Sequence, residues 1–130
     1  MEIKTRLIIE ILGSPKAHVE RTVSKVLVEL KQRKVKILKS YISPAKEVDK
    51  FYSSFAEVEL KLDNLEMLNE ICFDFMPSVV EIIEPKEIRE DPKVIEDFLN
   101  DILARLHKHG MIMRNLHAEN VLIKRELKKA

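Results

Sequence analysis

Glycine, cysteine and tryptophan are almost absent from this sequence, whose 130 residues include two glycines, one cysteine and no tryptophan. Phosphate-binding loops and dinucleotide fingerprints need several closely spaced glycines, whereas Gly13 and Gly110 lie far apart. The single cysteine, Cys72, excludes an internal disulfide and suits a reducing compartment. No apolar run reaches the ~18 residues of a membrane span, and we expect no signal peptide. These absences predict a cytoplasmic protein without a nucleotide-binding loop.

Charge is plentiful but segmented. Hydrophobic residues make up 45% of the chain and charged residues 35%, which is typical of a globular protein. Residues 1–50 carry 12 basic and 6 acidic side chains, residues 51–101 carry 4 and 14, and residues 102–130 carry 7 and 2. This pattern indicates segments that neutralise each other, within or between subunits. Abundant Ile, Glu and Lys with a single glutamine favour a thermophilic microbial source.

Apolar periodicity predicts six elements in the first 84 residues. Strict alternation predicts strands over 3–12, 35–42, 55–62 and 78–84, and stripes at helical spacing predict helices over 15–33 and 65–75. Ser14 and Asp63 are the expected N-caps, with Pro15 as the first helical residue. Pro77 is expected to end the second helix.

The order β-α-β-β-α-β predicts an α+β, ferredoxin-like domain over residues 1–85. Four antiparallel strands would carry two helices on one face and leave the other face charged. On that open face, Arg6 and Lys4 are expected across from Glu57 and Glu59. Residues 86–91 form a connector, and residues 92–130 a helical coiled-coil segment.

From residue 95 onward, every third or fourth residue falls on one seam with 4-3-4-3 spacing, the heptad rule for coiled coils. The seam consists of Ile95, Leu99, Ile102, Leu106, His109, Met113, Leu116, Asn120, Ile123 and Leu127. Asn120 at position a is the type of residue that fixes register and favours a dimer. Glu119 and Lys124 would attract each other across a parallel pair. A parallel dimer through residues 92–130 is therefore the first expectation and a tetramer the second.

Gly110 leaves the continuity of this helix open. Cationic residues before it, with glycine following, are typical of a helix C-terminus, which would produce a hairpin of two shorter helices. The heptad phase continues unbroken across Gly110, however, and a glycine inside a helix costs only ~1 kcal/mol. We expect one continuous helix.

No catalytic constellation is visible, so we expect no enzyme, no cofactor and no metal. His107 and His109 are two residues apart and point to nearly opposite sides of a helix, so they cannot share a metal within one chain. Cys72 lies on the apolar stripe of its helix and is expected to be a buried structural thiol.

A basic run offers a nucleic-acid hypothesis. Its members are Lys31, Arg33, Lys34, Lys36 and Lys39. These cations suit phosphates, but the first strand lacks the aromatic residues on which RNA-binding domains of this topology stack bases. Nucleic acid is therefore an unlikely partner, and an RNA-binding adaptor is a minor alternative.

Topology and the Gly13 turn after the first strand resemble an ACT-type regulatory domain. That resemblance implies an effector site at the turn Gly13, Ser14, Pro15 and Lys16, although the family commonly carries Asp-x-x-Gly there. The whole chain also resembles small archaeal proteins that join such a domain to a C-terminal coiled coil, which implies no activity. The leading hypothesis is a non-enzymatic homo-oligomeric scaffold, and the ACT-like sensor is its first alternative.

Overall fold

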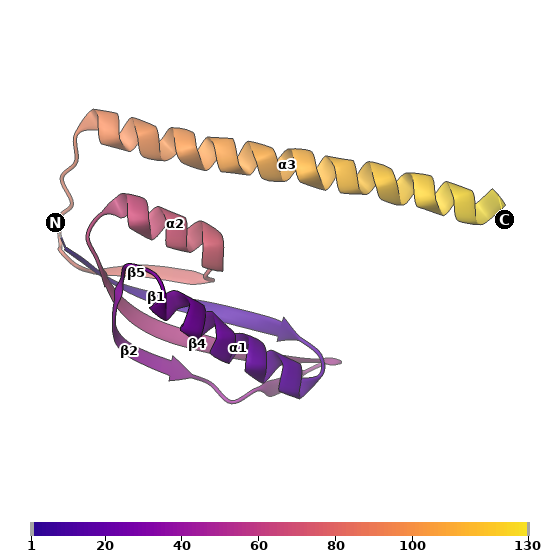
Figure 1. Cartoon of the computed structure of the whole chain (residues 1–130), viewed down its shortest axis with the longest axis horizontal. Coiled ribbons are helices and arrows are strands. Elements are labelled where there is room, and N and C mark those ends of the chain that lie inside the picture. Colours follow the sequence, from indigo (N-terminus) through magenta and orange to yellow (C-terminus); the bar gives the residue numbers. More distant parts are fainter. Residues whose placement is uncertain (1, 130) are drawn as a thin grey trace. The chain divides into compact units, whose positions relative to one another are not determined.

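The computed structural model describes residues 2–129 and divides into two units, the first ending at Ile88 and the second starting at Arg89. The first unit is an antiparallel sheet with two helices, and the second contains one long helix (Figure 1). The predicted α+β class with a long C-terminal helix is confirmed.

The sheet is organised around two long central strands, β1 (Ile3–Gly13) and β4 (Phe51–Leu62). They pair antiparallel along their whole length, from Ile3 opposite Leu62 to Gly13 opposite Tyr52. β2 (Lys36–Ile42) flanks β4, and β5 (Val79–Glu84) flanks β1, which gives the order β2-β4-β1-β5.

A fifth strand, β3 (Lys46–Val48), corrects the expectation of four strands, because the segment between the predicted strands 35–42 and 55–62 contains a hairpin. Val48 pairs with Phe51, so only two residues make the turn. Asp49 adopts φ 55°, the left-handed conformation that such tight turns require. β4 consequently begins at Phe51 rather than near Phe55. The usual Asn-Gly or Asp-Gly signal of a hairpin is missing from the sequence.

Helices α1 (Lys16–Lys31) and α2 (Leu65–Phe75) cover one face of the sheet (Figure 1). Alternate residues of β1 and β4 point to that face and are buried, as the period-2 pattern predicts. The core comprises Ile3, Leu7, Val23, Leu27, Leu30, Ala56, Val58, Leu60, Leu62, Leu68 and Ile71.

Both predicted N-caps differ by one residue. α1 begins at Lys16 after Pro15, whose carbonyl accepts hydrogen bonds from the amides of His18 and Val19, and no side chain caps this helix. The extended backbone of Asn64 lets its side chain accept from the Met67 amide at 2.9 Å, so Asn64 caps α2 in place of Asp63.

The second unit contains α3 (Pro92–Lys129), which is one uninterrupted helix through Gly110. The expectation of a continuous helix is confirmed, and the hairpin alternative is wrong. At its start, the Asp91 carboxylate accepts from the Lys93 amide at 3.3 Å, and the Asp91 carbonyl accepts from the Ile95 amide at 3.2 Å. Asp91 thus caps the start of α3.

Thr5 provides a stability test because its side chain is fully buried and its Oγ1 has no hydrogen-bond partner among residues 2–129. A buried hydroxyl without a partner loses its hydration and gains nothing in return. Thr5→Val keeps the shape, so we expect it to raise the free energy of unfolding by about 1 kcal/mol in chemical denaturation. Thr5→Ser, which keeps the hydroxyl and loses the methyl group, should lower it by about 1 kcal/mol. A less stable Thr5→Val protein would contradict this account.

Candidate functional site

The most extensive candidate surface is the seam, the ten heptad residues of α3 defined above. No described residue of α3 is buried. Seven of the seam's large apolar side chains are exposed, from 46% at Ile95 to 71% at Leu127, and Ile102 is half-buried. Fully burying one such side chain contributes roughly 1.5–3 kcal/mol, and monomeric proteins rarely expose a long contiguous apolar strip. The seam therefore has the physical properties of an interaction surface.

Charges along α3 are distributed unevenly. Its first ten residues contain one cation, Lys93, against three carboxylates, and Lys93 Nζ lies 3.2 Å from Asp97 Oδ1. Further along, Arg105 Nε lies 3.2 Å from Asp101 Oδ2. Its last ten residues contain four cations and one carboxylate, Glu126. The helix thus has an acidic beginning and a basic end.

The histidines of α3 do not belong to a metal-binding cluster in the described part of the chain. Within residues 2–129, no three His, Cys, Asp or Glu side chains are grouped so as to hold a metal ion. His107, His109 and His117 are all exposed. Nor does any described helix combine the length and apolar character that crossing a membrane requires.

The open face of the sheet carries a three-member ion-pair cluster centred on Arg6. Its Nε donates to Glu57 Oε1 at 2.6 Å, and its Nη1 donates to Glu81 Oε2 at 2.9 Å. The hydrogen bond to Glu57 raises the pKa of Arg6 above its ordinary value. On β4, Lys4 lies across from Lys61 rather than from Glu57 or Glu59, and on β5 it lies across from Glu84. Arg6 therefore joins β4 and β5 through β1.

A shallow depression of about 350 Å³ adjoins this cluster, lined by Lys39, Ser40, Tyr41, Glu57 and Glu59. The register places Lys39 across from Glu59 and Tyr41 across from Glu57. One cation faces two carboxylates, so the depression has no charge complementarity for an anionic ligand.

The five basic residues proposed for nucleic acid do not form one patch free of acidic groups. Arg33 Nη2 lies 2.6 Å from Asp74 Oδ2, and its guanidinium stacks 5.4 Å above the centre of the Phe75 ring. Both partners belong to the end of α2, so Arg33 links the bend that follows α1 to α2. Lys31 is the last residue of α1, and Lys34 lies in the turn that follows.

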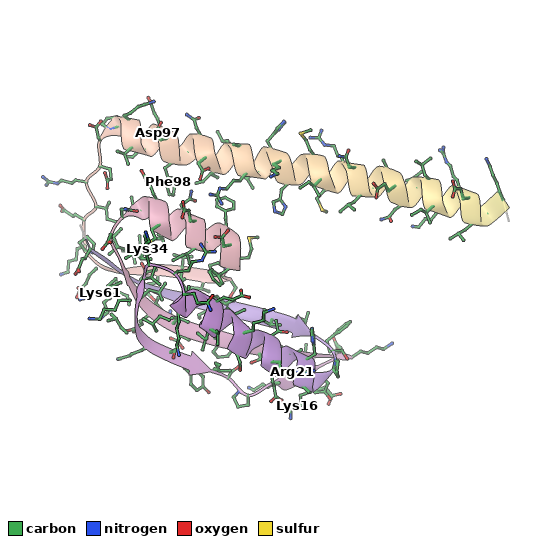
Figure 2. All side chains as sticks on the ribbon, viewed as in Figure 1. Lys16, Arg21, Lys34, Lys61, Asp97 and Phe98 are labelled. Carbon is green, nitrogen blue, oxygen red and sulfur yellow. The ribbon has the colours of Figure 1, made fainter. Side chains whose placement is uncertain are left out.

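The other two members, Lys36 and Lys39, lie on β2, the edge strand. Lys36 pairs with Lys61 in the register, and Lys39 with Glu59. Figure 2 labels Lys34 and Lys61 at one end of the first unit, and Lys16 at the other. The basic run and the proposed effector turn therefore occupy opposite ends.

The four residues of the effector turn are contiguous in space. Gly13 ends β1, Ser14 and Pro15 form the turn, and Lys16 opens α1. A depression of about 290 Å³ beside Lys16 is lined further by Glu20, Ser24 and the loop residues Ile42, Ser43, Pro44 and Ala45. The sequence does not predict that residues 42–45 lie beside Lys16, because local sequence patterns do not show where a loop lies after a strand ends. Nothing buried and charged lies in this depression to bind an effector.

Cys72 lies half-buried on α2, and burial raises the pKa of its thiol. A raised pKa disfavours the thiolate, which is the nucleophilic form. The structure therefore agrees with a packing role for Cys72.

Comparison with known families identifies the chain. The model of the MJ0538 family matches residues 4–130, so the protein belongs to the MJ0538 family. The match includes both the sheet unit and all described residues of α3, and the long helix is thus part of what the family shares. No curated protein matches the sequence.

The effector turn can be tested at Gly13. Its φ lies outside the left-handed region, and an added Cβ would lie 3.6 Å from Val19 Cγ2, an ordinary contact distance. We therefore expect Gly13→Ala to fold normally and to raise the free energy of unfolding by about 0.5 kcal/mol, because alanine restricts the unfolded chain. Thermal and chemical denaturation measure this change. A loss above about 1 kcal/mol would show that the turn requires glycine.

Proposed function

We propose that this protein is a non-enzymatic homo-oligomeric interaction module in which α3 binds a second copy of the chain. One observation supports this proposal most directly: a continuous 38-residue helix exposes an unbroken heptad seam. Isolated helices in water are marginal, and their stability in proteins comes mostly from packing of an apolar face. A second α3 supplies that packing with matching spacing.

The energetic balance favours association. Seven of the ten seam residues are Ile or Leu and one is Met, so most layers of a paired helix bury aliphatic side chains. Each fully buried side chain contributes roughly 1.5–3 kcal/mol, whereas Gly110 costs about 1 kcal/mol within the helix. His109 and Asn120 are the two polar exceptions, and Asn120 is a residue type that specifies partner and register.

The first unit is, in this proposal, a ferredoxin-like domain presented by the assembly. Its strand order β2-β4-β1-β5 supports this, because removing the short β3 leaves two βαβ-type halves with the first and third strands at the centre. A single half-buried thiol is compatible with a reducing cytoplasm.

The two alternative functions have less support. An RNA-binding adaptor would need free cations, whereas Arg33 is paired with Asp74, and Lys39 faces Glu59. An ACT-like sensor would need polar groups directed into the turn, and the depression beside Lys16 is lined mostly by small or exposed side chains.

Leu116→Asp in the full chain tests the proposal. Residue 116 occupies a seam layer, so each subunit would bring an unpaired carboxylate into an apolar interface. We expect the dissociation constant, measured by analytical ultracentrifugation, to rise at least about a hundredfold.

Ala118→Asp is the matched control, because it introduces the same carboxylate two residues away on the opposite side of α3. It should leave the oligomeric mass unchanged. A monomeric parent chain at tens of micromolar, or equal effects of the two substitutions, would refute self-association through the seam.

A further inference from the structure

We infer that the two copies of α3 pair antiparallel, with the acidic beginning of each helix against the basic end of the other. This inference rests on the proposed self-association and specifies its geometry. It differs from the parallel arrangement favoured by Asn120 and by the single attraction between Glu119 and Lys124.

The spacing of the seam residues is the same from either end of the helix. Its 4-3-4-3 spacing, taken from the C-terminal end, repeats the spacing from the N-terminal end, so a reversed second copy overlaps along the full seam. Seam residues occupy positions d and a in turn, starting with d at Ile95. In the reversed pair, each d residue lies opposite an a residue of the second copy: Ile95 with Leu127, Leu99 with Ile123, Ile102 with Asn120, Leu106 with Leu116, and His109 with Met113.

Charges beside the seam favour this arrangement. In antiparallel coils, g positions face g positions and e positions face e positions. Arg105 and Glu119 occupy g positions, and Glu96 and Lys124 occupy e positions. Arg105 then faces Glu119 of the second copy, and Glu96 faces Lys124 of the second copy. The twofold axis produces each pair twice, which makes four attractive pairs. A parallel coil leaves Arg105 against Gly110 and keeps only the attraction between Glu119 and Lys124, twice.

The charges at the two ends of α3 also favour antiparallel pairing. The first ten residues of α3 have one cation and three carboxylates, and the last ten have four cations and one carboxylate. A parallel pair would place the two basic ends together and the two acidic ends together. An antiparallel pair places each basic end along an acidic one, and these exposed charges interact over about 8 Å at physiological salt.

The centre of the helix supplies a third argument, from Gly110. Its φ is ordinary, and an added Cβ would meet only Arg114 Nη2 at 3.8 Å, so the single chain has no need for glycine there. In the antiparallel pair, Gly110 lies against its own copy on one side of the seam, and Ile112 lies against its own copy on the other. The glycine permits close backbone approach where the apolar contact is centred.

Asn120 counts against this geometry, because its amide lies opposite Ile102 rather than a second amide. The antiparallel pair contains two layers in which Asn120 lies opposite Ile102. Each is the third layer from one end of the coil, and its neighbouring layers contain only aliphatic residues. The features that favour this geometry are the two Arg105–Glu119 pairs, the complementary charges of the helix ends, which include Glu96 and Lys124, and the central contact.

Cysteine cross-linking of the full chain distinguishes the orientations. On a Cys72→Ala background, chains with Leu99→Cys and chains with Ile123→Cys are mixed and oxidised, and products are assigned by mass spectrometry. We expect disulfides between residues 99 and 123 and none in either chain alone. Disulfides between identical positions would show a parallel pair, and a dimer that gives neither product would also overturn the inference. A monomeric mass would instead refute the proposed self-association.

Charge reversal gives an independent measurement. Arg105→Glu should weaken the dimer about tenfold, because it turns two attractions into repulsions. Adding Glu119→Arg should restore the dissociation constant to within about threefold, since opposite charges face each other again. In a parallel pair the added Glu119→Arg faces Lys124 and weakens the dimer further. Repulsion between residues 101 and 105 inside one helix cannot be relieved by residue 119, so rescue reports contact between chains.

Discussion

The antiparallel pairing of β1 with β4 determines the rest of the first unit. Eleven consecutive residue pairs join the two strands, from Ile3 with Leu62 to Gly13 with Tyr52. Since strand side chains alternate between faces, this one register decides which residues enter the core and which face water. The buried set that includes Leu7 and Val58 packs under α1 and α2, and the opposite set brings Arg6 to Glu57. A slip of one residue would exchange the two faces, burying the ion-pair cluster and exposing the core.

α3 obeys a different constraint. A sheet buries its apolar face under its own helices, but a straight helix of 38 residues has no element of its own unit to cover it. Its apolar side chains nevertheless follow the 4-3-4-3 heptad spacing, which a helix surrounded by water does not need. The family match extends through both units, so the sheet and the long helix occur together in the family model. The first unit has a core of its own, and the proposed self-association would bury the apolar side chains of the second.

Sequence periodicity predicted the elements whose signal lies within one segment. The strands β1 and β5, the apolar stripes of both short helices and the continuous α3 follow from spacing alone. The hairpin of β3 was missed because its turn uses Asp49 and Lys50 instead of a glycine, and Asn64 replaced Asp63 as cap because a one-residue difference depends on local backbone angles. Arg33 shows the other limit. Its partner Asp74 is 41 residues away, so no local pattern distinguishes a structural ion pair from a phosphate-binding cation.

In the proposed assembly, the orientation of the two α3 helices determines how far apart the two sheet units are attached. With 38 residues at a rise of about 1.5 Å, α3 is about 57 Å long. A parallel pair holds both helix beginnings, where the sheet units attach, at the same end, and those units would compete for the same space. An antiparallel pair separates the two attachment points by about the helix length, since each begins where the other ends. The open sheet face with its Arg6 cluster is then presented twice, at a distance set by α3. A ligand or macromolecule recognised by that face would bind two separated sites, and its avidity would depend on matching this span. In the proposed antiparallel assembly, the length of α3 would therefore act as a spacer between the two sheet units.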